Sequence, residues 1–365
     1  FIKHPSRVYL MPEAATREEL EKKREIGAAD LGTLFHEALK IYSMRLADEK
    51  LDFASVGDRR KEYIREAVEY AMTDYNNSVF YDSKRNEYMR EKIYSMLERT
   101  AWALGKQTQA GSFVPEKFEK SFIFEQNGMK IVGKIDRIDI ARADDRSYVK
   151  IIDYKSGKRT LDLGRIYDGL SLQLMVYLYS LMKDNEPGAA MYYNIDNPIV
   201  DYKEGVSAED GILSSLQPQG IVNSDSTVLK LLDNVTTSGK SCYIPVSYNK
   251  DGSLSKTSQA ASGDRLKLLG EYASMKLVEL GERISEGEVA PNPYPDSCDY
   301  CPYRLVCGFD AARDGYRYPT KLNNDDSCYI KFSEGMNKDG KKLEGIHTAG
   351  AADEQRPHAR GDFGK

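Results

Sequence analysis

No stretch of this 365-residue chain is apolar for long enough to cross a membrane, since a spanning helix needs about 20 apolar residues in succession. The opening residues Phe1, Ile2, Lys3, His4 and Pro5 lack the apolar core of a secretory signal. A GxxxxGK[ST] phosphate loop is also missing, so we expect no ATP hydrolysis by these residues. These absences predict a cytoplasmic protein with no membrane partner and no motor of its own. Because the chain lacks an initiator Met, we expect it to be part of a longer polypeptide.

Positive charge is not in excess either. The chain has 52 Lys and Arg residues against 57 Asp and Glu residues, which gives a net charge of −5. Nucleic-acid binding is carried largely by basic surface, so this balance argues mildly against a general affinity for DNA or RNA. It leaves room for a DNA contact that is local or shared with a partner subunit.

Cysteine is scarce, and its positions are uneven. Three of the five cysteines are clustered as Cys298, Cys301 and Cys307, whereas Cys242 and Cys328 stand apart. Without a secretory signal, CxxC spacing is typical of metal or redox chemistry rather than of a disulfide framework. Three thiolates alone cannot complete a tetrahedral metal site.

The first third of the chain is predicted to be helical. From Asp30 onwards, apolar residues recur at helical spacing, with His36 on the flank of the apolar stripe. Residues 58–79 and 83–105 predict two further helices. We therefore expect residues 1–110 to form a helical cap that carries His36.

The next part of the chain carries the signals of a small sheet. Branched and aromatic residues predict strands over Phe118–Phe124, Ile131–Ile140 and Tyr148–Tyr154, joined as an antiparallel meander. A helix over Ser171–Met182 and a strand over Ala189–Ile195 follow. The predicted fold class is α/β, with a mixed sheet of about four to five strands flanked by helices.

The remaining residues are less regular. We expect an insertion over residues 201–259, with a helix over Ser224–Val235 and a short strand near Tyr243, inside a core that spans residues 111–310. A long helix over Asp264–Ser285 then leads to the cysteine loop 298–307. Residues 311–365 form a tail, of which Thr348–Lys365 is predicted to be disordered because it has almost no large apolar residue.

The strongest functional signal is the buried strand that ends in Asp153, Tyr154 and Lys155. Side chains alternate along a strand, so Asp153 and Lys155 point the same way, and Asp136 in the preceding strand could face the same cleft. Two carboxylates and an ammonium at the end of a small sheet suit a divalent-metal site that cuts phosphodiesters. An isolated Asp-x-Lys pair is more often a salt bridge on a solvated face.

Five sequence blocks occur in order along the chain: Gly32-Thr33-Leu34-Phe35-His36, Gly133-x-x-Asp136-Arg137-x-Asp139, Asp153-Tyr154-Lys155-Ser156-Gly157, Gln173-Leu174-x-x-Tyr177 and Cys298-x-x-Cys301-x5-Cys307. With these blocks the chain resembles the PD-(D/E)XK nucleases of the RecB type, and most closely the C-terminal nuclease domains of AddB subunits of AddAB helicase–nucleases. The resemblance implies a restriction-endonuclease-like core.

The resemblance also implies roles for single residues. Asp136 and Asp153 match the metal-binding carboxylates, His36 matches the histidine that reaches the metal, and the carbonyl of Tyr154 is a further candidate ligand. Lys155 matches the catalytic lysine. The metal is expected to be Mg²⁺ or Mn²⁺.

Gln173 and Tyr177 match a helix motif that borders the family's site and helps to hold DNA or the lysine. They are four residues apart and so share a helix face. Gln173 is expected at a buried position, where it needs a polar partner. Tyr177 fits ordinary core packing equally well.

Other residues have alternative interpretations. His36 taken alone would be a hydrogen-bonded histidine at the edge of the core. Asp139 is expected to pair with Arg137 rather than to bind metal, because the alternation of side chains along the strand places Asp139 and Asp136 on different faces of the sheet. Glu116 and Glu119 precede the sheet, where a supporting acid for the site is one interpretation, but surface charge is the favoured one for both.

For the cysteines, the resemblance implies a [4Fe–4S] cluster whose fourth ligand is a cysteine N-terminal to the histidine helix. This chain has no cysteine before Cys242. We expect the chain to begin just after the missing ligand, with a cluster in the full-length protein and an absent or incomplete one here. Cys242 or Cys328 could substitute, although their spacing does not match the family. Otherwise Cys298, Cys301 and Cys307 are free thiols.

The resemblance implies a metal-dependent DNA exonuclease domain that processes double-strand breaks in recombination and repair, with DNA and an AddA-like motor subunit as partners. One alternative is a stand-alone or CRISPR-associated RecB-like exonuclease. Another, of a different class, is a non-catalytic scaffold module that binds DNA ends. Intact Asp136, Asp153 and Lys155 count against the scaffold, which has no need of them.

Overall fold

The computed structural model describes residues 28–339 except 82, 127–128, 203 and 300. Its centre is a six-stranded sheet in the order β1-β2-β3-β4-β5-β8. The strands are β1 (Val114–Gln126), β2 (Met129–Ala143), β3 (Arg146–Lys155), β4 (Glu186–Asn194), β5 (Gln219–Asn223) and β8 (Ala260–Ala261). Among the described residues, no helix combines the length and apolar character that crossing a bilayer requires.

The first three strands form the predicted antiparallel meander. Strand β4 then runs parallel to β3, and two short helices, α5 (Leu163–Tyr167) and α6 (Gln173–Leu181), make the crossover. Strand β5 is antiparallel to β4, and β8 is parallel to β5. The sheet is therefore mixed, as expected, but it has six strands instead of four to five.

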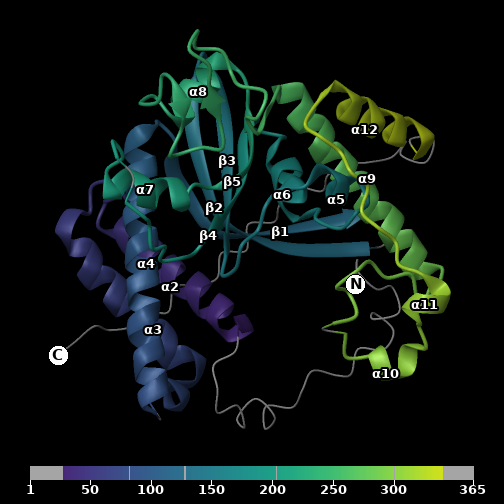
Figure 1. Cartoon of the computed structure of the whole chain (residues 1–365), viewed down its shortest axis with the longest axis horizontal. Helices are drawn as coiled ribbons and strands as arrows, with labels where there is room; N and C mark the ends of the chain where they lie inside the picture. The colour runs from purple at the N-terminus through teal and green to yellow at the C-terminus, as the bar shows by residue number, and fades with distance from the viewer. Residues whose placement is uncertain (1–27, 82, 127–128, 203, 300, 340–365) are drawn as a thin grey trace.

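One face of the sheet is covered by α2 (Ala28–Asp48), α3 (Arg60–Tyr81) and α4 (Lys84–Ala110), with a short 3₁₀ turn, η2 (Gly57–Arg59), before α3 (Figure 1). These helices confirm the three predicted from helical spacing. They share one hydrophobic core with Ile152, Tyr154 and Tyr193 of the sheet. The helical cap is thus a layer packed directly on the sheet.

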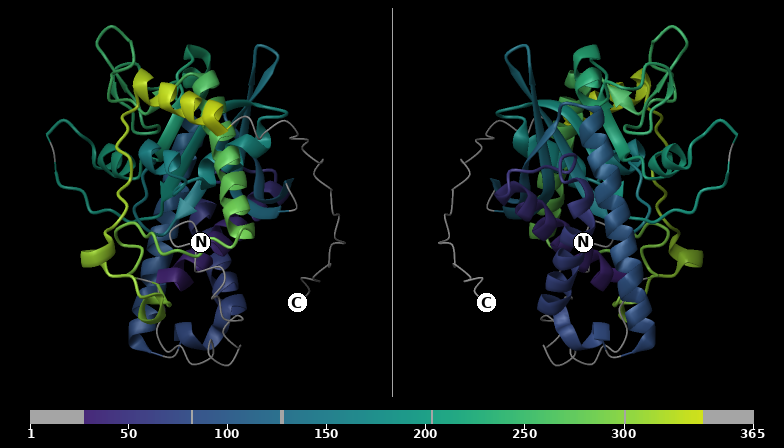
Figure 2. Two further views of the ribbon diagram at one scale, coloured as in Figure 1. Left: turned by 90° about the vertical axis from the view of Figure 1, so that its right-hand side faces the viewer. Right: turned by 90° about the vertical axis from the view of Figure 1, so that its left-hand side faces the viewer.

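The other face is covered by α6 and by the long helix α9 (Gly263–Ser285), with α12 (Asp326–Asp339) beyond it. Figure 2 shows α9 and α12 in front in one view and α4 in front in the other, so the sheet lies between two helical layers. The alternation along β3 explains this arrangement, because Ile152 and Tyr154 point to the cap while Val149 and Ile151 point to α6 and α9.

Residues 201–259 correct one expectation. They contain α7 (Ala208–Ser215), β5 and α8 (Ser226–Leu232), and β5 belongs to the central sheet, so this region is partly core rather than an insertion. The short strand expected near Tyr243 is present on either side of that residue. Tyr243 lies between two short paired strands, β6 (Gly239–Lys240) and β7 (Ser247–Tyr248).

The region after residue 310 also differs from the prediction. After the short helices α10 (Arg304–Cys307) and α11 (Ala311–Asp314), helix α12 packs on α9 through buried Cys328, Tyr329 and Phe332. These three residues form a short apolar stripe. The charged residues around them keep the mean hydropathy of the region low, so the sequence does not indicate a packed helix. The predicted disorder of Thr348–Lys365 falls outside the described residues.

Candidate functional site

The site begins where strands β2 and β3 separate. Their pairing ends at Arg137 and Ile152, and the next residues of each strand diverge. Asp136 lies at this fork, where its Oδ2 accepts the backbone N–H of Tyr154 at 2.7 Å. The carboxylate of Asp136 is thereby fixed between the two strands, with its other oxygen directed to helix α2.

Asp136 is one of three side chains that can share a cation. Its Oδ1 lies 3.2 Å from Nδ1 of His36 on α2. One ligand atom from each of His36, Asp136 and Glu119 lies within 4.8 Å of the others. Two carboxylate oxygens and one imidazole nitrogen at this spacing are a donor set for a metal ion.

Glu119 corrects the interpretation of surface charge that its sequence context favours. Its side chain is only 13% exposed and lies 2.7 Å from Nζ of Lys134. The register of β1 and β2 places it opposite Asp136, between the pairs Phe118–Arg137 and Lys120–Ile135. Its φ of +51° departs from strand geometry, which the alternation of residue types does not reveal. Glu116, in contrast, is an exposed acid that pairs with Lys117 and Arg142, as expected of surface charge.

Asp153 and Lys155 point the same way, as the alternation along the strand predicts. Nζ of Lys155 lies 2.5 Å from Oδ2 of Asp153, whose side chain is 1% exposed. Among the described residues, Oδ1 of Asp153 has no hydrogen-bond partner although it is buried. A buried, unsatisfied carboxylate oxygen beside Asp136 is an atom that a bound cation would satisfy.

Helix α6 holds Lys155 from the other side. Oε1 of Gln173 accepts a hydrogen bond from Nζ of Lys155 at 3.0 Å, and Nε2 of Gln173 donates to the hydroxyl of Tyr177 at 2.8 Å. Gln173 is exposed rather than buried, which corrects the expectation, but it has the predicted contact with the lysine. Tyr177 is both a core residue and the end of this hydrogen-bond chain.

The structure also explains why a glycine stands at position 133 in the second sequence block. It lies opposite Phe122 in the register of β1 and β2. A Cβ at this position would collide with the Phe122 ring, which in turn packs edge-on against Tyr177. Because Gly133 has no side chain, the Phe122 ring can lie over it and pack against Tyr177 at the edge of the site.

The electrostatics of the cluster are those of crowded acids. Burial raises the pKa of Asp153 to about 6, and the negative charge of Asp136 acts in the same direction, whereas Lys155 and His36 oppose the shift. Burial lowers the pKa of His36, but its hydrogen bond to Asp136 and the charges of Asp136, Asp153 and Glu119 outweigh burial and raise that pKa above the usual value. Excess negative charge in a partly closed site is what a divalent cation neutralises.

Asp139 plays the structural role that alternation predicts. Its oxygens accept two hydrogen bonds from the guanidinium of Arg137, at 2.6 and 2.9 Å, and one oxygen lies 2.8 Å from Nζ of Lys150. Asp139 is fully buried, and Arg137 stacks over Phe53 of the cap. This network ties the sheet to the helical cap directly behind Asp136.

The clustered cysteines lie in a separate pocket. Cys298, Cys301 and Cys307 line a cavity of about 470 Å³ together with Phe309 and Tyr316. A backbone hydrogen bond of 3.0 Å from Arg317 to Pro293 closes the loop that holds them. Burial raises the pKa of Cys298, while the hydroxyl of Tyr316 opposes the shift.

Neither remaining cysteine can complete this set. Cys328 is buried between α12 and α9, and Cys242 lies against the carbonyl of Asp210. The alternative in which Cys242 or Cys328 substitutes as fourth ligand is not supported, because neither lines the pocket of the other three thiols. The described residues supply three thiols to one pocket, which fits part of a cysteine-ligated cluster.

Comparison with known proteins identifies the family of this chain. Residues 7–308 match the PD-(D/E)XK nuclease superfamily. The chain is 36% identical over 330 residues to a protein of Lachnoclostridium phytofermentans named as the B subunit of an ATP-dependent helicase/deoxyribonuclease, with 82% of this chain and 28% of that protein covered. Proteins of the same name from Clostridium botulinum and a Thermoanaerobacter species are 31% and 30% identical, over 81% and 86% of this chain. The chain spans less than a third of the length of these relatives, at 28 and 30% of the latter two.

Proposed function

Because this chain belongs to the PD-(D/E)XK nuclease superfamily, we propose that it is a metal-dependent exonuclease domain that hydrolyses phosphodiester bonds of DNA. The observation that carries the proposal is the convergence of four elements. His36 from α2, Asp136 from β2, Asp153 and Lys155 from β3 and Gln173 from α6 meet where β2 and β3 diverge.

His36, Asp136, Glu119 and Asp153 would hold Mg²⁺ or Mn²⁺, with the carbonyl of Tyr154 as a further ligand. Glu119 is added to the set predicted from sequence because it lies within reach of His36 and Asp136. A bound cation of this kind polarises the scissile phosphate and lowers the pKa of a bound water.

Lys155 is the residue we assign to the chemistry itself. Asp153 and Gln173 hold its ammonium in place, and the hydrogen bond from Gln173 to Tyr177 fixes the amide that accepts from it. From this position the ammonium orients the attacking water or stabilises the negative charge that builds on phosphorus. No covalent intermediate is required.

The test is digestion of linear DNA by the purified chain with Mg²⁺ or Mn²⁺ and with EDTA. Lys155→Ala should abolish cleavage, whereas Lys230→Ala, on the exposed surface of α8, should cut at the wild-type rate. Cleavage by Lys155→Ala at the wild-type rate would show that the assignment is wrong. A wild-type chain that binds DNA ends but never cuts them would favour the scaffold alternative.

We also propose that the domain acts within a helicase–nuclease that processes double-strand breaks. The support is the name of its relatives, each called the B subunit of an ATP-dependent helicase/deoxyribonuclease, which implies another subunit. An AddA-like ATPase should copurify with the natural full-length protein. Copurification with CRISPR proteins, or with nothing, would favour the stand-alone or CRISPR-associated alternative.

For the cysteine pocket we propose a [4Fe–4S] cluster held by Cys298, Cys301 and Cys307, with a fourth ligand from outside the described residues. The support is the three thiols around one cavity in a loop closed at its base. The cluster would hold the loop beyond α9 in one conformation. Iron and acid-labile sulfide in the full-length protein, both lost in Cys301→Ser, would support it.

A further inference from the structure

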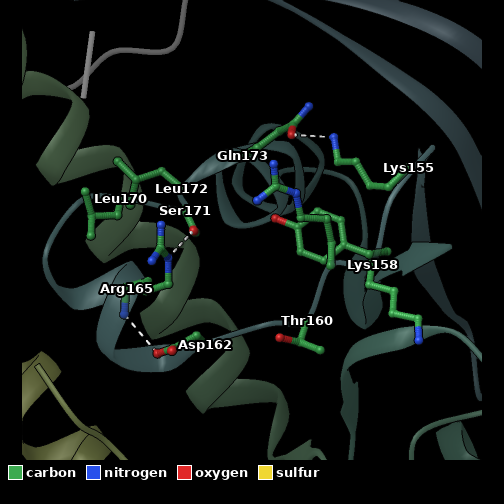
Figure 3. A pocket seen from close by; sticks show the side chains of 11 residues that line it. Lys155, Lys158, Thr160, Asp162, Arg165, Leu170, Ser171, Leu172 and Gln173 are labelled. Atoms are coloured by element: carbon green, nitrogen blue, oxygen red, sulfur yellow. Dashed lines mark hydrogen bonds between the residues drawn. The ribbon is translucent and has the colours of Figure 1, made fainter. Parts of the chain in front are cut away.

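A second cavity opens beside Lys155 and is not part of the cation cluster (Figure 3). It has a volume of about 470 Å³, within the range of roughly 300–1,000 Å³ typical of small-ligand sites. The loop after β3 contributes Lys158, Arg159 and Thr160, helix α5 contributes Arg165, and the turn between α5 and α6 contributes Ser171. Figure 3 shows Lys155 and Gln173 on one side of the cavity, with Arg165 and Ser171 facing them across it.

The cavity is strongly basic. Among the described residues, none forms an ion pair with the exposed side chains of Lys158 and Arg159 or with half-buried Arg165. Lys134, Lys150, Lys155 and Lys267, in contrast, each pair with a carboxylate. The one carboxylate in the lining is Asp162, whose Oδ1 accepts the backbone N–H of Arg165 as the N-cap of α5. Three cations without an acidic partner in one cavity are the composition of an anion site.

This cavity is also held in shape before any ligand arrives. The backbone N–H and carbonyl of Arg159 both bond to the side chain of Asn194 at the end of β4, at 2.9 and 3.1 Å. Nε of Arg165 lies 3.5 Å from the hydroxyl of Ser171. A site whose loop is already ordered loses less entropy on binding, so these bonds favour affinity for a ligand.

We infer that this cavity is a phosphate subsite, which binds a backbone phosphate of the DNA strand next to the phosphate that is cut. The inference rests on the proposed nuclease function, because Lys155 borders both the cation cluster and the cavity. It explains how a chain with a net charge of −5 can engage DNA, since the positive charge is concentrated beside the cutting site. The pocket-like shape suits one strand rather than an intact duplex.

The direct test is the salt dependence of single-stranded DNA binding, measured in EDTA so that no cleavage occurs. Arg159→Gln with Arg165→Gln should weaken binding and lower the slope of log K against log salt by about 0.7 for each phosphate that is no longer neutralised. Both substitutions leave the backbone bonds to Asn194 intact. Arg146→Gln, an exposed arginine at the opposite end of β3, is the matched control and should keep the wild-type slope. Thermal unfolding of each variant checks that it is folded.

A second arm identifies the source of the phosphate. With Mg²⁺, a neutral methylphosphonate next to the scissile phosphate should slow cleavage by the wild type but not slow the double variant further. If a 5′-phosphate is needed instead, and an internal methylphosphonate has no effect, the pocket binds a strand terminus and not the backbone. An unchanged slope in the double variant would overturn the subsite while leaving the nuclease proposal intact. Absence of metal-dependent cleavage by the wild type contradicts the nuclease proposal whatever the slopes are.

Discussion

Replacing Asp153 by Asn should make the metal-free protein more stable at neutral pH. Asp153 is almost fully buried, one of its oxygens has no hydrogen-bond partner among the described residues, and Asp136 lies close to it. Burial and the charge of Asp136 raise its pKa from 3.8 to about 6, so the folded protein holds this proton more tightly than the unfolded chain does. The neutral amide of Asn keeps the shape and cannot ionise.

The sign and size of the effect follow from this pKa. A raised pKa contributes stability that is fully present below pH 3.8 and is lost as the pH rises through about 6. A shift from 3.8 to about 6 corresponds to about 3 kcal/mol at about 1.4 kcal/mol per unit. His36 offsets part of this loss of stability, because the negative charge of Asp153 helps to raise the pKa of His36. We therefore expect Asp153→Asn to gain about 1–3 kcal/mol in unfolding free energy relative to wild type between pH 4.5 and pH 7.5.

The assay is urea unfolding in EDTA at several pH values across this range, for wild type and variant. Asp145→Asn is the matched control, because Asp145 is an exposed turn residue with a φ of +57°, which Asn tolerates. The gain in unfolding free energy should be specific to Asp153→Asn. Adding Mn²⁺ at pH 7.5 should stabilise wild type more than Asp153→Asn. A difference between wild type and Asp153→Asn that stays flat with pH, or that favours wild type as the pH rises, would refute the argument.

Four further outcomes are expected. Asp139→Ala should lower the unfolding free energy by about 3–5 kcal/mol in urea titrations, because it leaves Arg137 and Lys150 buried and unpaired; a loss below about 1 kcal/mol would contradict the network's structural role. Glu119→Gln should weaken Mn²⁺ binding in calorimetry, and an unchanged affinity would exclude it as a ligand. Gln173→Leu should reduce the DNA cleavage rate without lowering the thermal stability, because Gln173 is exposed and contacts Lys155. Full activity of this variant would show that Gln173 does not position Lys155. Cys301→Ser should lose bound iron in the full-length protein, whereas the isolated chain with the same substitution should keep its metal-dependent nuclease activity; retention of iron would place the cluster elsewhere.

The site is predictable from sequence where it depends on strand alternation and local spacing. Asp153 and Lys155 share a face because they are two residues apart in a strand, and Gln173 and Tyr177 share one because they are four apart in a helix. The same rule separates Asp139 from Asp136. These relations hold for any regular element, so they need no knowledge of the tertiary fold.

The parts that sequence reasoning misses depend on irregular geometry or on contacts far apart in sequence. Glu119 reaches the site through a positive φ and a register with β2, neither of which residue types reveal. Strand β5 is only five residues long and lies between helices, so its place in the sheet depends on pairing with β4. In the described part of α12, Cys328, Tyr329 and Phe332 are buried among charged residues, and their partners lie on α9 and at Tyr167 of α5.

The central claim is that a divalent cation binds where β2 and β3 diverge. Crystals soaked in Mn²⁺ and measured for anomalous scattering test it most directly. The account predicts a peak about 2.0–2.3 Å from a carboxylate oxygen of Asp136 and close to His36 and Asp153. A peak elsewhere on the molecule, with none at Asp136 under saturating Mn²⁺, would contradict it.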